Sequence, residues 1–112
     1  MEWTRARFLQ GDVAALMDEI HDQYFDIRMI LYDQAGRVWS VPIGEAKWGP
    51  YDKKVVVQGV TGYHIEDTEK IRIYDINRLW LDDARGVLRL ECNVPLGVWL
   101  HVAADFRVML SR

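Results

Sequence analysis

Residues 27–43 have the sequence IRMILYDQAGRVWSVPI, and the fold class is inferred outward from this stretch. Apolar side chains recur at every second position on both sides of a central polar segment, at Ile27, Met29 and Leu31 and again at Trp39, Val41 and Ile43. This alternation is typical of β-strands. In the segment between them, DQAG at 33–36, an aspartate can begin a turn and a glycine can adopt a positive φ. The stretch therefore predicts a short antiparallel hairpin.

The rest of the chain repeats the same pattern. A second turn, DDARG at 82–86, separates two alternating apolar runs and predicts a second hairpin. No helical segment follows Phe25, so crossover connections between parallel strands are not expected. Further strands are predicted at 3–8, 54–60, 70–76, 96–102 and 105–110, with Ala103-Ala104 as a tight reversal. The fold class is mainly β (α+β), an antiparallel sandwich or small barrel of seven to eight strands.

Two places in the predicted strands break the regular pattern. The alternation changes at residues 75–77, which predicts a bulge or bend there. We expect Asp75 and Asn77 to hydrogen-bond the backbone of that bulge, with a catalytic role for a buried Asp75 as the alternative. Gly59 and Gly62 stand inside another strand and are typical of a bend rather than of a phosphate-binding loop.

An amphipathic helix is predicted after Gly11. Asp12 can cap its first turn, and one apolar stripe collects Val13, Leu16, Met17, Ile20 and Tyr24. The segment 12–26 carries five acidic residues and no lysine or arginine. A helix of this kind packs on the sheet and presents an acidic outer face, which is either solvated or open to a basic protein partner.

Composition restricts the class of protein. The chain has 112 residues, 14 basic against 17 acidic side chains for a net charge of −3, and 50% apolar residues, so we expect one globular domain over 1–112. No apolar stretch approaches the roughly 18 residues of a membrane span, and the first residues do not resemble an export signal. Cys92 is the only cysteine, so no internal disulfide can form. The expected location is cytoplasmic.

The longest irregular segment, residues 44–53, is the first candidate binding site. Lys47, Trp48 and Tyr51 place two aromatic rings and a cation in one loop, a combination common at binding surfaces. The alternative is that Trp48 folds back and covers one end of the barrel, since an exposed tryptophan is costly.

The histidines supply the second candidate site. Their spacing matches no metal-binding motif, and no nucleotide-binding or nucleophile motif occurs, so neither a metal nor a cofactor is predicted. His64 precedes Glu66 and Asp67, while Trp99 and His101 share the outer face of a strand opposite Leu100. Trp99 and His101 either line a pocket or pack across strands. His64 is either part of a solvated strand end or an imidazole that a neighbouring carboxylate orients for acid-base work or joins in binding a metal. Cys92 falls on the apolar face, where a thiol is inert.

The function predicted from these features is a small, non-catalytic interaction module that self-associates as a homodimer. Apolar residues on both faces of some strands, such as Val55, Val56 and Val57, favour contact with a second layer or another subunit. The alternative is a small-molecule-binding barrel or minor enzyme with a pocket at the Trp48/Tyr51 loop, which requires His64, Asp75 or His101 to converge there. Net negative charge disfavours nucleic acid, although single-strand stacking on exposed aromatic rings stays open.

Overall fold

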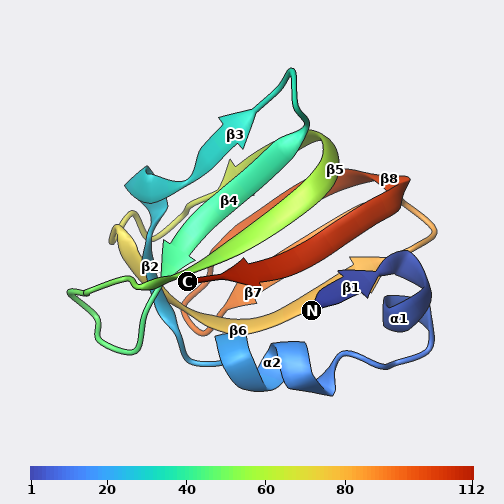
Figure 1. The fold of residues 1–112 in the computed structure, drawn as a ribbon. Coiled ribbons are helices and arrows are strands. Elements are labelled where there is room, and N and C mark those ends of the chain that lie inside the picture. The colour runs from blue at the N-terminus through green and yellow to red at the C-terminus, as the bar shows by residue number, and fades with distance from the viewer.

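The computed structural model describes residues 1–112, which form a mainly β fold (Figure 1). Its elements are, in order, β1 (Glu2–Thr4), α1 (Arg5–Leu9), α2 (Ala14–Ile20), β2 (Tyr24–Asp26), the 3-10 helix η1 (Ile27–Met29), β3 (Leu31–Asp33), β4 (Val38–Ile43), β5 (Lys53–Glu66), β6 (Ile73–Asp82), β7 (Val87–Cys92) and β8 (Gly97–Ser111). One eight-stranded antiparallel sheet has the order β2-β6-β7-β8-β5-β4-β3, with β1 added beside β8. The predicted fold class is confirmed. Neither α-helix has the length and apolarity needed to cross a bilayer.

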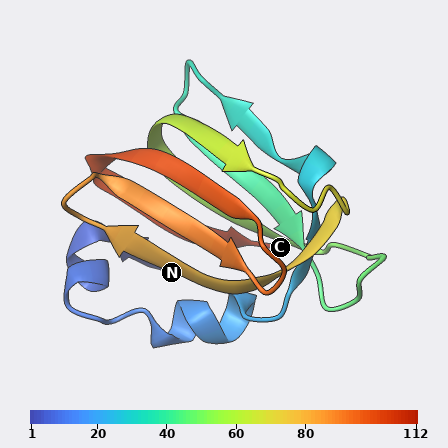
Figure 2. The same cartoon turned by 180° about the vertical axis from the view of Figure 1, so that it is seen from behind.

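The sheet curls into a half-barrel with two facing layers, and the long strands β5 and β8 pass through both. The front layer contains β3, β4, the first half of β5, the second half of β8, and β1. The back layer, seen directly in Figure 2, contains the second half of β5, the first half of β8, β7 and β6. Both helices lie at one end of the layers, below the opening between them.

The bend in β5 is caused by glycine. Gly59 has φ +82°, and a Cβ there would come within 3.0 Å of the Phe106 Cα, so both the backbone conformation and the space require glycine. The register with β8 shifts on either side of Val60. The predicted bend is therefore confirmed at Gly59, whereas Gly62 has neither a positive φ nor a close contact that requires glycine. The predicted reversal at Ala103-Ala104 is wrong, because β8 continues through these residues as a single strand that turns with β5.

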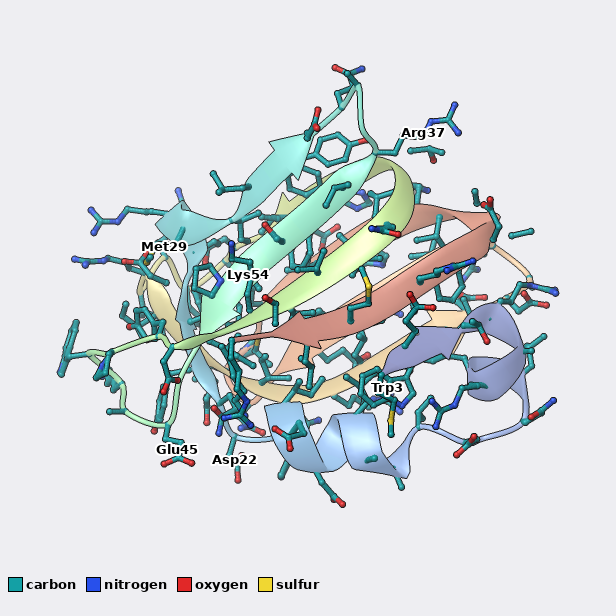
Figure 3. The ribbon with its side chains drawn as sticks, viewed as in Figure 1. Trp3, Asp22, Met29, Arg37, Glu45 and Lys54 are labelled. Atoms are coloured by element: carbon teal, nitrogen blue, oxygen red, sulfur yellow. The ribbon has the colours of Figure 1, made fainter.

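The interior between the layers is filled by one apolar cluster. The strictly alternating burial of β4 places Trp39, Val41 and Ile43 inside, as predicted. The helix α2 closes the lower opening with Leu16 and Ile20, both fully buried. The remaining large members include Trp3, which lies between the sheet and α2 (Figure 3), Phe25, Tyr74 and Phe106.

Three predictions about the N-terminal third are wrong. The helix begins at Ala14 after Val13, without the Asp12 cap, because Arg7 Nε donates to the Asp12 carboxylate at 2.9 Å. Tyr24 belongs to β2, since α2 ends at Ile20. The strand predicted over 3–8 is shortened to β1 and followed by α1.

The strand predicted from the alternation of Ile27, Met29 and Leu31 is replaced over its first part by η1. The buried Asp26 accepts the backbone N–H of Arg28 at 2.9 Å, which caps this single turn before β3 begins. An aspartate side chain that competes for backbone donors in this way favours a turn over a continued strand.

Both predicted hairpins are confirmed, with a difference at the first turn. Gly36 donates its N–H to the Asp33 carboxylate at 3.0 Å, and the positive φ of 56° falls on Arg37. The predicted irregularity near 75–77 is also confirmed, as a register shift between Ile76 and Arg78. The Asp75 carboxylate, however, accepts from the Asn93 side chain at 2.8 Å and makes no hydrogen bond to the bulge backbone.

Candidate functional site

The outer face of the back layer carries four aromatic and cationic side chains in one line. Trp80 of β6 pairs with Arg89 of β7, Arg89 with Trp99 of β8, and Trp99 with His64 of β5. Directly paired residues project on the same face, and their chain neighbours Leu79, Leu88 and Leu100 are buried in the core. These four residues, hereafter the outer row, therefore project away from the core.

The side chains of the outer row stack on one another. The Trp99 indole lies 4.7 Å from the His64 imidazole with 5° between the ring planes. The Arg89 guanidinium carbon lies 4.9 Å from the Trp99 ring and 5.2 Å from the Trp80 ring. Since His64 and Arg89 come from strands on opposite sides of β8, they cover opposite faces of the Trp99 indole. The stack leaves the edges of that ring for solvent or a ligand.

The Trp99 indole also lies over Gly97 of the same strand. A Cβ built on Gly97 would stand 2.2 Å from the indole ring, closer than any carbon atoms approach without covalent bonding. The absence of a side chain at this position is therefore what lets the ring lie along the strand. Gly97 acts as a positioning residue for Trp99.

Glu91 fixes the other end of the stack. Its carboxylate accepts from Arg78 Nε at 2.7 Å and from Trp80 Nε1 at 3.0 Å. The hydrogen bond from Arg78 is the main cause that lowers the pKa of Glu91, with burial opposing it and the Trp80 bond adding to it. Each oxygen of the Glu91 carboxylate thus accepts a hydrogen bond, and Arg78 balances its charge. Arg78 in turn lies 5.0 Å from the Trp80 ring.

Arg89 is the one cation of this cluster without an acidic partner. Eight of the ten arginines form ion pairs within 4.0 Å, and Arg37 and Arg89 do not. Arg89 contributes a long-range attraction that lowers the pKa of Glu91, but it makes no hydrogen bond with it. Its guanidinium thus has an ordered position and free N–H donors.

The structure brings three of the predicted site residues together. His64 and Trp99 are members of the outer row, and His101 follows on β8, with its ring 6.0 Å from that of His64. His101 is exposed and pairs with Gly62 and Val87 in the adjacent row. Trp99 packs across strands on His64, which is one of the two arrangements expected for Trp99, and His64 itself is exposed near the end of β5.

Lys47, Trp48 and Tyr51 lie elsewhere, in the loop between β4 and β5. Trp48 is 73% exposed, and its only cationic neighbour is Lys47, whose Nζ stands 5.2 Å from the ring. The interpretation of Trp48 as a lid over the barrel is therefore wrong. Tyr51 donates its hydroxyl to the Lys47 carbonyl, which folds the loop on itself away from the outer row.

The largest cavity, about 570 Å³, opens beside the same loop and is polar. It is lined by Asp18, Glu19, Gln23, Glu45, Ala46, Pro50, Asp52, Lys53 and Arg112. His64, Asp75 and His101 line none of the cavities, so the convergence required for a pocket built on them does not occur.

Burial raises the pKa of the Cys92 thiol to about 12, and the negative charge of Asp75 raises it further. The structure contains no group of three or more side chains that could hold a metal ion.

Trp80, Arg89 and Gly97 are site residues that sequence reasoning missed. The turn at 82–86 contains a usable signal, because a hairpin that pairs Asp82 with Val87 also pairs Trp80 with Arg89. The register of β7 with β8 crosses a less regular connection, so the contact of Arg89 with Trp99 has no comparable signal in the chain.

Comparison of the chain with models of protein families, with curated proteins and with solved structures gives no match. The function is therefore argued from the geometry of the molecule.

Proposed function

We propose that this protein is a non-catalytic interaction module that self-associates as a homodimer and binds a protein partner. The support comes from where the chain places its unusual side chains. The interior is packed with apolar residues, whereas aromatic, cationic and apolar groups stand on the outer faces of both layers. Such groups on a sheet surface are typical of contact with another protein.

The outer face of the front layer carries the proposal of self-association. Leu31, Ser40, Val56 and Met109 pair directly across β3, β4, β5 and β8, and so form one row on this face. Leu31 is 63% exposed, and Val38 and Pro42 extend the apolar area along β4. Neither helix covers this face, because both lie at the lower end of the layers. A second copy would remove these side chains from water.

The charges around this apolar row suit a self-complementary contact. Lys54 projects beside Val56, and Asp33 stands beside Leu31 at the end of β3. At the other end, Glu2 pairs with Arg107 at 3.1 Å. Because both positive and negative side chains surround the row, a second copy related by a two-fold axis is not repelled by a surface of a single charge.

Light scattering coupled to gel filtration tests the proposal. The parent protein should elute as a dimer at micromolar concentration, and Leu31→Lys should shift it to monomer by placing a charge in the row. Leu9→Lys is the matched control, since Leu9 is 52% exposed on α1, away from this face. A parent protein that stays monomeric over this range, or equal effects from both variants, would contradict self-association through the front layer.

The expected setting of this module is the cytoplasm. A free thiol at Cys92 suits a reducing compartment, and the fold uses no disulfide for its stability. Fractionation of cells that express the tagged full chain tests this location.

The second candidate function is binding of a small molecule in the 570 Å³ cavity beside the 44–53 loop. Its volume lies in the range of ligand pockets, which favours this candidate, but its lining is charged where such pockets are mostly apolar. Glu45→Gln and Asp52→Asn would weaken the binding of a basic ligand in this cavity and leave the oligomeric state unchanged, so the two functions can be separated.

A further inference from the structure

We propose that the outer row is a binding site for an acidic peptide segment, with one carboxylate of the partner held by Arg89. This inference rests on the proposed role as an interaction module but not on self-association, which uses the opposite layer. It states which kind of partner the back layer would bind, and the site consists of the four directly paired residues of the outer row.

Arg89 is held in position without an acidic partner. The chain has more acidic than basic residues and pairs nearly every other arginine, yet leaves this guanidinium without an acceptor. The two indoles at 4.9 Å and 5.2 Å hold it in place before any partner arrives. A planar guanidinium that is already ordered loses little entropy when it binds a carboxylate with two parallel hydrogen bonds.

The stacking of the outer row leaves ring edges, and not ring faces, for a ligand. Aromatic faces are electron-rich and ring edges are electron-poor. Arg89 and His64 cover the two faces of the Trp99 indole, so its positive edge is what remains for a ligand. An anion above the row would therefore meet ring edges and guanidinium N–H groups together.

The same geometry disfavours a nucleic acid. Base stacking needs a free aromatic face, and Trp99 has none. A run of phosphates would also meet carboxylates on both flanks, with Glu66 in the adjacent row and Asp82 on the other side. A single carboxylate placed over Arg89 is closest to the cation and farthest from these acids.

The neighbouring acid on β7 leaves the site available. Glu91 already accepts from Arg78 and Trp80, and its charge is compensated by Arg78 at 2.7 Å. It therefore neither occupies Arg89 nor presents a bare charge to the incoming carboxylate. Replacement of Glu91 is unsuitable as a test, because it would release Trp80 as well.

The experiment titrates the protein with a capped pentapeptide that has one central glutamate among glycines, and follows the arginine Nε–H and indole N–H signals by NMR. We expect saturable shifts at Arg89 and Trp99. Arg89→Gln should raise the dissociation constant at least tenfold. Arg89→Lys, which keeps the charge but loses the planar pair of donors, should raise it several-fold. Arg37→Gln is the matched control, since Arg37 is also unpaired but projects from the β3–β4 turn (Figure 3), and its guanidinium does not lie over an aromatic ring.

Three results would overturn the inference. These are no saturable shift at Arg89 in the folded parent protein, equal weakening by Arg37→Gln, and a twelve-residue oligothymidylate that shifts the row where the single-glutamate peptide does not. The amide signals of Val98 and Leu100 report whether each variant keeps the sheet intact, and Arg89→Lys supplies the comparison if Arg89→Gln disturbs it. Leu31→Lys should still bind the peptide, so failure here and failure of self-association are separate outcomes.

Discussion

The Trp99 indole and the His64 imidazole lie parallel, with 5° between their planes and 4.7 Å between their centres, on neighbouring strands of the back layer. They meet because Trp99 pairs directly with His64 in the β5–β8 register. Arg89 covers the other face of the same indole at 4.9 Å. The position of this one ring thus depends on three strands and on the glycine beneath it.

Gly97→Ala should displace the Trp99 ring, because the new Cβ would stand 2.2 Å from it. We expect loss of the stacked indole signal in near-ultraviolet circular dichroism and a free energy of unfolding lower by about 1–2 kcal/mol. In the Trp99→Ala background the same substitution should cost almost nothing, since the clash is gone. An unchanged indole spectrum in Gly97→Ala would show that the ring is not held over residue 97.

Two glycines of β5 should respond differently to alanine. Gly59 has φ +82°, and an alanine Cβ at this position would stand 3.0 Å from the Phe106 Cα, so Gly59→Ala should lower the free energy of unfolding by roughly 2 kcal/mol or more. Gly62 has no positive φ, and no atom lies within 4 Å of a Cβ added there, so Gly62→Ala should leave the free energy of unfolding nearly unchanged. Urea unfolding of both variants measures the contrast, and equal effects would contradict this account of the bend.

Much of the fold is predictable because it follows from side-chain alternation and turn residues. The burial of Trp39, Val41 and Ile43 follows from period two, and the turn at 82–86 follows from its aspartates and Gly86. The path of β8 through Ala103-Ala104 is not predictable in this way. Its continuity follows from the pairing of Val102 and Arg107 with the bent part of β5, which is distant in sequence, and from the close approach of Phe106 to Gly59.

The candidate site is predictable only in part. Trp99 and His101 share a strand face by alternation, and that inference needs no tertiary information. The stack of His64 and Arg89 on Trp99 depends on which strands become neighbours, and local sequence does not encode strand order. The exposure of Trp48 likewise depends on the path of its loop, in which the Tyr51 hydroxyl donates to the Lys47 carbonyl.

Asp26→Asn should make the protein less stable at neutral pH. The Asp26 side chain is 5% exposed; burial opposes its ionisation, but hydrogen bonds from the Arg28 backbone and from both the Arg72 and Arg28 side chains outweigh burial and lower its pKa. A lowered folded-state pKa gives stability that is present above the ordinary aspartate pKa of about 4 and is lost as pH falls through the lower value. We expect a cost of roughly 2 kcal/mol at pH 7.

The difference between the parent protein and Asp26→Asn should begin to narrow below about pH 4, where the Asp26 carboxylate of the unfolded chain gains its proton, and should keep narrowing until the folded carboxylate, with its lowered pKa, is protonated as well. Thermal unfolding from pH 3 to pH 7 measures this convergence. A constant difference over the whole range would show that the charge of Asp26 is not what the two arginines stabilise.

Cys92 should be unreactive in the folded protein. With burial raising the pKa of its thiol to about 12, the thiolate fraction at pH 8 is on the order of one in ten thousand. An aromatic disulfide reagent should modify the native protein slowly and the urea-unfolded protein at once. Rapid native modification would place the thiol at the surface and weaken the account of β7 as a core strand.

Native mass spectrometry of the purified protein tests the central claim most directly, because one spectrum reports both the number of subunits and any retained small molecule. An interaction module that self-associates predicts a species of twice 13.1 kDa at micromolar concentration, with no additional bound mass. A monomer that carries a small molecule of constant mass would contradict the proposal and assign the protein to the second candidate function.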